Sequence, residues 1–541
     1  MKSAESSDFT KAGIEEHWRT NMLLRDVIKR NRRLFPRKPA IIEGDRAFTY
    51  EDLTARVNRL ANALKGMGIT KGDRVAFMGP NCHEFVEFYL ACAKTGCIAV
   101  PVNARFSPDE VKYLIHHSES SLFILKEEDA EKQREIKKKL GKMKLILCGS
   151  FDEEEGPSYE EILEKASDAE IDVEIHPDDL YMIMYTSGAT GLPKGVMHTH
   201  RSVMANINTM TIEKRIVRED VNGLVMPLFH IGGFWPLMCH MYQGATTVLF
   251  SRFEVVELLS AIEKHRITFV NLVPTMLYRL VTYPELRRYN VESLRFIMYA
   301  GGPIAKEQLK IAMQVLGPKI FYTGLGSTET GAMTCFPGME HALEGPMAEK
   351  IGSVGKDAIG VEVAIADSEG NELGPNQIGE IIAKGENVAV GYWKMPQETA
   401  EAFRDGWFYT GDIGFRDEDG YVFIVDRKKD LIICGGENIS PREIEEVLYK
   451  HPAVKEVAVI GVPDAEWGEV VKAIVALKND FVGSVTEAEL IDFCKNFLAG
   501  YKKPRSIDFM EELPKNAAGK IDKRALKELY WKKTVLKEEE G

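Results

Sequence analysis

The stretch from residue 74 to residue 126 alternates between short apolar segments and segments with helical spacing. Arg74–Gly79 and Cys97–Val102 suit strands, and Glu84–Gly96 between them suits a helix. Ser107-Pro108-Asp109-Glu110 is a capping box with proline at the first helical position, which predicts a second helix to about Ser118. Ser121–Lys126 then returns as a strand. This rhythm predicts parallel βαβ units, and therefore an α/β fold with layered sheets.

The C-terminal part of the chain has a different rhythm, which predicts a smaller α+β domain of about a hundred residues. Its elements are a capping box at Ser440 that opens a helix over Glu443–Lys450, strands over Val454–Val462 and Val470–Leu477, and a helix capped by Thr486 and ended by Gly500. The charged run Asp426–Asp430 precedes this unit. We therefore expect two domains, residues 1–428 and 429–541, with their boundary in this charged run.

Composition excludes several classes of protein. The 541 residues contain 69 Lys and Arg against 82 Asp and Glu, a net charge of −13, which argues against a nucleic-acid binder. No apolar run reaches the roughly 18 residues of a membrane span, and the polar N-terminus lacks the apolar core that is typical of a signal peptide. The eight cysteines show no zinc or CxxC spacing, as expected for reduced core residues. We expect a cytoplasmic protein with no integral membrane association; its oligomeric state, monomer or homodimer, stays open.

The strongest chemical signal is the loop Tyr185–Gly195, which follows the apolar strand Leu180–Met184. Its glycines free the backbone to fold around an anion, and its hydroxyls and lysine add donors. It is not a Walker A loop, because Pro193 precedes Lys194 and Gly195 follows it. A plain polar turn is the alternative, but so many donors and glycines in ten residues favour phosphate binding.

This loop resembles the phosphate loop of the adenylate-forming superfamily, which includes acyl-CoA synthetases, adenylation domains of peptide synthetases and firefly-type luciferases. Ala189 stands where the family usually has threonine. Further segments match in the family's order, and the resemblance spans about Phe48 to Lys520: Thr323–Thr330, Tyr409–Asp412, Asp426–Leu431 and Pro514–Lys520.

The resemblance implies an ATP or AMP site, with Mg²⁺ held by Glu329 and Thr190. Asp412 would accept from both ribose hydroxyls, since a carboxylate offers two acceptor oxygens. Lys429 falls at the hinge position, and the catalytic residues implied are Lys520, His230, Thr190 and Glu329. The nucleotide-binding residues implied are Thr186, Ser187, Gly188, Ala189, Thr190, Gly191, Lys194, Gly301, Gly302, Leu325, Gly326, Ser327, Thr328, Asp412, Ile424 and Arg427.

The implied reaction joins a carboxylic acid to a thiol through an acyl-adenylate, with ATP, Mg²⁺ and coenzyme A as cofactors. Acetate-using relatives place tryptophan where this chain has Gly326, so an open pocket is expected. That favours a medium-chain, aromatic or alicyclic acid over acetate. The acyl and CoA channel would be lined by His230, Ile231, Gly232, Phe234, Ala300, Gly324, Gly326, Gly435 and Gly436.

Other functions remain open at this level. A stand-alone adenylation enzyme that loads a carrier protein is the first alternative, and a luciferase-type oxygenase is more distant. An inactive nucleotide-binding regulator is the non-enzymatic alternative, against which the retained Lys194, Glu329, Asp412 and Lys520 argue. Both half-reactions are reversible, so the enzyme could also run from acyl-CoA toward ATP.

Overall fold

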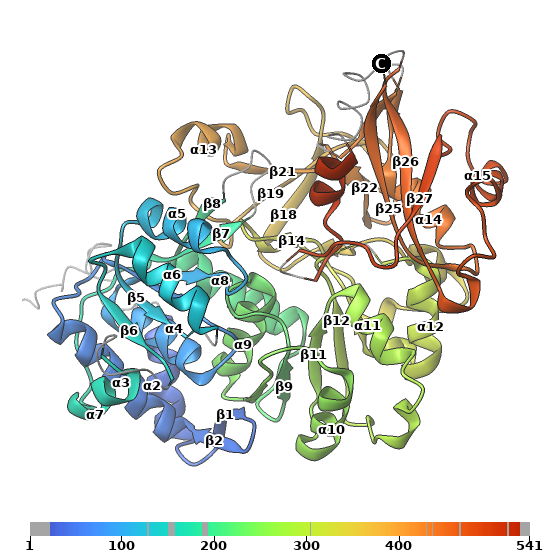
Figure 1. Ribbon diagram of the computed structural model, residues 1–541. Helices are drawn as coiled ribbons and strands as arrows, with labels where there is room; N and C mark the ends of the chain where they lie inside the picture. Colours follow the sequence, from blue (N-terminus) through green and yellow to red (C-terminus); the bar gives the residue numbers. More distant parts are fainter. Residues whose placement is uncertain are drawn as a thin grey trace, which may run out of the picture.

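The computed structural model describes residues 22–126, 129–149, 157–186, 193–302, 304–428, 430–434, 437–464, 467–516 and 519–530. Two mainly parallel sheets and their helices form the bulk of the chain, and a smaller C-terminal domain lies at one end (Figure 1). This arrangement confirms the predicted fold class. Among the described residues no helix is both long and apolar enough to span a bilayer.

The first sheet has the strand order β6-β5-β3-β4-β7-β8, and only β8 runs antiparallel to its neighbour. The predicted strands at residues 74, 97 and 121 are therefore adjacent in one sheet. Its members are β3 (Arg74–Met78), β4 (Ile98–Val102), β5 (Ser120–Leu125), β6 (Leu145–Leu147), β7 (Leu180–Thr186) and β8 (Lys194–Thr199).

The second sheet has the order β13-β12-β11-β9-β10-β1-β2 and is parallel except for β2. Its members are β1 (Pro39–Glu43), β2 (Arg46–Thr49), β9 (Val221–Leu224), β10 (Thr246–Leu249), β11 (Phe269–Leu272), β12 (Phe296–Tyr299) and β13 (Phe321–Tyr322).

The two large sheets have three cores, one shared between them and one on the outer face of each sheet. This division arises because successive side chains of a strand point to opposite faces. Val75 and Phe77 of β3 join the core shared by both sheets, whereas Ala76 and Met78 join the core on the outer face. Helices between the sheets and beside this shared core are α2 (Leu24–Leu34), α3 (Tyr50–Gly66), α4 (His83–Thr95), α8 (His200–Glu213) and α9 (Ile231–Gln243). Outer helices are α5 (Pro108–Ser118), α6 (Ala130–Leu140), α10 (Val255–His265), α11 (Pro274–Val281) and α12 (Lys306–Leu316).

An antiparallel sheet connects these layers to the C-terminal domain. It consists of β18 (Val361–Ala366), β19 (Gly379–Gly385), β20 (Phe403–Arg404), β21 (Trp407–Arg416) and β22 (Val422–Arg427). Two short hairpins precede it, formed by β14 (Gly326–Ser327) with β15 (Gly331–Ala332), and by β16 (Thr334–Cys335) with β17 (Lys356–Asp357). The helix α13 (Pro396–Ala402) packs beside this sheet, whereas α7 (Tyr159–Lys165) packs on α3 in the core shared by the two large sheets.

The C-terminal domain has its own sheet, β24-β23-β26-β25, to which β27 adds in parallel to β26. Its core is separate from those of the large layers. Its elements are β23 (Ile432–Cys434), β24 (Glu437–Ile439), α14 (Pro441–Leu448), β25 (Val454–Asp464), β26 (Gly468–Leu477), α15 (Glu487–Lys495) and β27 (Ser506–Phe509).

Helix ends agree with the sequence in one case and differ in two. Ser107 and Glu110 form the predicted reciprocal capping box. At Ser440 only half of the box forms, because the Glu443 carboxylate binds Lys502 at 2.8 Å and does not reach back to the cap. The helix capped by Thr486 ends at Lys495 with Asn496 as its C-cap, before the predicted end at Gly500.

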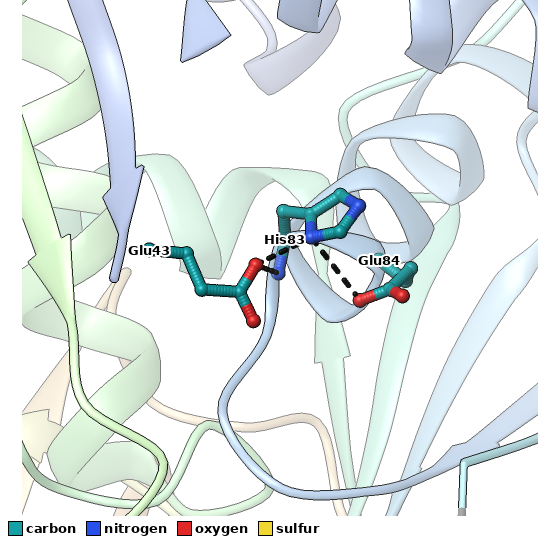
Figure 2. A group of neighbouring side chains, drawn as sticks. All are labelled: Glu43, His83 and Glu84. Atoms are coloured by element: carbon teal, nitrogen blue, oxygen red, sulfur yellow. Dashed lines mark hydrogen bonds and ion pairs between the residues drawn. The ribbon is translucent and has the colours of Figure 1, made fainter. Parts of the chain in front are cut away.

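A group of charged side chains fastens β1 to the start of α4 (Figure 2). The His83 ring lies between Glu43 and Glu84, and Lys126 binds both oxygens of Glu84 at 2.8 Å. Burial alone would lower the pKa of His83, but the neighbouring carboxylates of Glu160, Glu43 and Glu84 raise it to about 9. One side-chain atom from each of Glu43, His83 and Glu84 lies within 4.8 Å of the others, a spacing that could also hold a metal ion. Here the Lys126 ammonium and the protonated His83 ring already balance the charge of the two carboxylates.

We predict that this histidine makes stability depend on pH. Its pKa is raised from 6.5 in the folded protein, so its contribution is complete below about pH 6.5 and is lost as the pH rises through about 9. The advantage of the wild type over His83→Gln should shrink by up to about 3 kcal/mol across that range. Urea unfolding of both proteins at several pH values measures this, and a constant difference would contradict it.

Candidate active site

A cleft of about 1400 Å³ lies between the large layers and the C-terminal domain. Its wall is formed by the ends of β7 and β8, the start of α9, the loop after β12, the β14–β17 hairpins, β21, β22 and the loop that carries Lys520. The residues proposed from the sequence that line it are Thr186, Lys194, His230, Ile231, Gly232, Ala300, Gly301, Gly324, Leu325, Gly326, Ser327, Thr328, Glu329, Arg427 and Lys520.

Other residues proposed from the sequence lie elsewhere. Phe234 is fully buried in the core between the sheets, where it packs on Tyr89 and Trp235, so it is not a channel residue. Ile424 packs behind the cleft against the core of the antiparallel sheet. Residues that lie outside the described part of the chain are Ser187, Gly188, Ala189, Thr190, Gly191, Lys429, Gly435 and Gly436.

Lys520 is the contribution of the C-terminal domain to the cleft. Its side chain lies against the backbone of Gly301, where an added Cβ would be 3.0 Å from Lys520 Cε; Gly302 lies alongside. The loop is held by a hydrogen bond from Thr275 Oγ1 to the Gly519 carbonyl at 3.4 Å. Burial, together with the charge of Arg427, lowers the pKa of Lys520 to about 8. Among the described residues no carboxylate pairs with this ammonium, so an anion in the cleft would stabilise its charged form.

His230 caps the N-terminus of α9 with its ring. Nδ1 accepts a hydrogen bond from the Gly232 N–H at 3.0 Å, which leaves the proton of the neutral ring on Nε2. Burial, assisted by the nearby charge of Lys520, lowers the pKa of His230 to about 3. The ring is therefore neutral near pH 7. It can donate one hydrogen bond into the cleft but supplies no charge.

Glu329 and Lys194 face the cleft from neighbouring segments. Tyr392 donates its hydroxyl to Glu329 Oε1 at 2.9 Å, and Lys194 Nζ lies 4.9 Å from the centre of the same ring. Glu329 makes no ion pair with any residue that the structure describes. An oriented carboxylate without a cation fits Mg²⁺, which prefers oxygen ligands. Its proposed companion Thr190 is outside the described residues.

Asp412 and Arg427 pair across β21 and β22. Arg427 Nε donates to Asp412 Oδ1 at 2.9 Å, and Asp412 is only 5% exposed. The arginine therefore covers the aspartate on the side of the cleft, and both charges act on Lys520. A nucleotide ribose that binds Asp412 would share this carboxylate with Arg427.

The structure gives a reason for glycine at position 326 that is separate from the size of the acyl pocket. An added Cβ there would lie 2.1 Å from the carbonyl oxygen of Gly331 on the facing strand β15, where Gly326 is paired with Ala332. The small residue is therefore required by the close approach of two backbones. Its absence of a side chain does not by itself measure the size of the acyl pocket.

Three further cleft residues were missed from the sequence. Tyr392 orients Glu329, and Arg105 donates to the Asn516 carbonyl across the two domains at 3.4 Å. Lys214 lines the cleft at the end of α8. None carries a local signal: a lysine after a helix is typical of a solvated C-terminus that complements the helix dipole.

Lys194 and Lys520 have no ion-pair partner among the described residues, and together with an oriented carboxylate and a neutral histidine they suit the binding of a nucleotide polyphosphate. Comparisons with known proteins agree. Residues 28–393 match the family model described as AMP-binding enzyme, and residues 443–520 match the AMP-binding enzyme C-terminal domain. The chain belongs to the AMP-binding enzyme family and is an ATP-dependent acid–thiol ligase.

Individual relatives cover nearly the whole chain. A feruloyl-CoA synthase from Amycolatopsis is 37% identical over 91% of this chain and 96% of its own length. A fatty acid–[acyl-carrier-protein] ligase, ScoC, from Streptomyces coeruleorubidus is 36% identical over 92% and 94%. The crystal structure of ATP-bound MatB from Rhodopseudomonas palustris superimposes with a TM-score of 0.85 at 31% identity, covering 94% of this chain and 99% of that one.

We predict that adenylation declines in alkaline solution as Lys520 loses its proton. The free enzyme should show kcat/KM for ATP that falls as the pH rises through about 8, because the ammonium is the form that attracts phosphate. Lys520→Arg keeps its charge at every accessible pH and should lack this decline, whatever its absolute rate. Pyrophosphate release from about pH 6.5 to 9.5 measures it. The same alkaline decline in both proteins would assign it to another group.

Proposed function

We propose that this protein is an AMP-forming acyl-CoA ligase for a medium-chain, aromatic or alicyclic acid. The observation that carries the proposal is the unpaired Lys520 ammonium inside a cleft that also contains Lys194 and Glu329. Such a cleft suits a reaction whose main obstacle is the approach of one anion to another. The feruloyl-CoA synthase named above supports an acid of this size.

In the first step an oxygen of the substrate carboxylate attacks the α-phosphorus of ATP, and the bond to the β-phosphate oxygen breaks. Pyrophosphate leaves and the acyl-adenylate remains. No general base is needed, because a carboxylic acid with a pKa of about 4–5 is already ionised near pH 7. Lys520 neutralises charge on the phosphates, and Mg²⁺ held at Glu329 would neutralise more. His230, which is neutral, can donate from Nε2 without repelling Lys520.

In the second step the thiol of coenzyme A attacks the acyl carbon and AMP leaves, while the thiol proton passes to solvent. Lys520 has no part in this step, because the bond that breaks joins the acyl carbon to the phosphate oxygen, and no bond to phosphorus changes. We propose that the C-terminal domain turns about Lys429 between the steps and brings Gly435 and Gly436 to the channel. The proposal is supported by the change of sheet between Arg427 in β22 and Ile432 in β23.

A carrier protein in place of coenzyme A is the second candidate, since ScoC, named as a carrier-protein ligase, is 36% identical. The proposed function also includes the reverse direction, from acyl-CoA, AMP and pyrophosphate to ATP, because each step is reversible.

The test is pyrophosphate release with Mg-ATP and a panel of acids: acetate, butyrate, hexanoate, octanoate, benzoate and cyclohexane carboxylate, each with and without coenzyme A. We expect turnover that requires coenzyme A and favours the larger acids.

Lys194→Ala should raise the KM for ATP roughly tenfold by removing one charged contact, whereas Lys310→Ala on the surface of α12 should not.

Two results would contradict the proposal. Preferred turnover of acetate would remove the assignment of acid size, and turnover that coenzyme A does not accelerate would place the carrier-protein reaction first.

A further inference from the structure

Lys214 places a buried amine in the wall of the cleft. It follows Glu213 at the C-terminal end of α8 and is only 8% exposed, yet it lines the cavity. Its Nζ has no hydrogen-bond or ion-pair partner among the residues that the structure describes. Lys214 is the C-cap residue of α8, but its backbone N–H alone makes the cap bonds, to the carbonyls of Met210 and Ile212, and its amine takes no part in them. A lysine in this position is unusual, since buried charges are normally paired.

The carboxylates in this part of the fold are already engaged. Glu213 Oε1 accepts the backbone N–H of Ile359 at 2.8 Å and makes no ion pair with Lys214. Asp220 is held by Arg295, with Nε at 2.7 Å, and by the hydroxyl of Thr268. Burial accordingly lowers the pKa of Lys214, since nothing opposes it but the weak influence of Cys239 and Cys335. The free protein thus carries an uncompensated donor at this point.

Lys214, at the end of α8, lies beside a later part of α9, at a distance along the cleft from Lys520. The helix begins beside Lys520, at its cap His230, and Lys214 lies near Cys239 further along. Nine residues of helix correspond to about 13 Å. Between the two ends the wall is mainly apolar, with Met210, Trp235, Pro236 and Ala332. A substrate whose reacting carboxylate is near Lys520 would point its tail toward Lys214.

We infer that Lys214 binds a second carboxylate at the distal end of the acid, and that the preferred substrate is therefore a dicarboxylic acid with an apolar middle. This inference rests on the proposed ligase function and specifies its substrate class. The two lysines would then bind the two ends of one molecule, with the apolar wall in between.

Charge decides between a dicarboxylic acid and a monocarboxylic acid of the same length. A dicarboxylic acid gives Lys214 the partner that the protein lacks, and a charged hydrogen bond out of water discriminates by about 10- to 100-fold. A monocarboxylic acid instead places a methyl or aromatic edge against the amine and leaves it unpaired. Sites built around a buried polar group reject analogues that cannot satisfy it more strongly than apolar pockets do.

The experiment compares matched pairs of acids on the wild type and on Lys214→Met. The pairs are adipate with hexanoate, suberate with octanoate, sebacate with decanoate, and terephthalate with benzoate, and pyrophosphate release with Mg-ATP and coenzyme A is the readout. In at least one pair the wild type should favour the diacid in kcat/KM by about 10- to 100-fold. Lys214→Met should lose that preference because its kcat/KM for the diacid falls, while its kcat/KM for the monoacid is unchanged or higher.

Thermal unfolding separates this role from a structural one. Methionine fills the space of the lysine without an unpaired charge, so Lys214→Met should raise the unfolding midpoint of the free protein while it lowers activity on the diacid. Lys310→Met, on an exposed lysine paired with Glu307 at 2.9 Å, is the matched control and should change neither property.

Each contrary result identifies what failed. A wild type that favours the monoacid in every pair overturns the dicarboxylate inference and leaves the ligase function intact. A parallel loss of diacid and monoacid turnover with a lower midpoint in Lys214→Met assigns the lysine to structure. No pyrophosphate release with any acid overturns the ligase function, and with it the inference.

Discussion

The burial of the Lys520 ammonium against the backbone of Gly301 is the contact on which the two-domain site depends. It needs a residue without a side chain at 301, where φ is +89° and a Cβ would press on the lysine. It also needs the C-terminal domain to bring its loop to Thr275. An ammonium without a carboxylate partner is unfavourable in this place, so the cleft of the free protein is prepared for a polyanion.

The same electrostatic principle acts at the other end of the cleft. Lys214 is also buried and has no ion-pair partner among the described residues, so a protein with a net charge of −13 places two such amines in the wall of one cleft. Between the two lysines lie a neutral histidine and apolar side chains, which separate the charges without neutralising them. Burying Lys520 and Lys214 without a carboxylate partner lowers the folding stability of the free protein, a cost that is common where a site is built for a charged ligand.

Local signals in the sequence predicted local structure, and the failures involve contacts between distant segments. Ser107 to Glu110 formed its capping box because both partners are adjacent, whereas Glu443 was diverted by Lys502, 59 residues away. Phe234 is a core residue because Tyr89 and Trp235 surround it, which no motif reveals. The motif order placed Lys194, Glu329 and Lys520 in one cleft, but Lys214 belongs to no motif and becomes visible only when the sheets are packed.

The measurement that tests the central claim most directly is the separation of the two half-reactions in Lys520→Ala. The account assigns the Lys520 ammonium to the attack at phosphorus, where charge develops, and not to the transfer of the acyl group from its adenylate. Acyl-adenylate formation from acid and ATP should fall by about 100-fold or more, while thioester formation from supplied acyl-adenylate and coenzyme A should stay within about threefold of the wild type. Equal loss of both half-reactions would contradict the account.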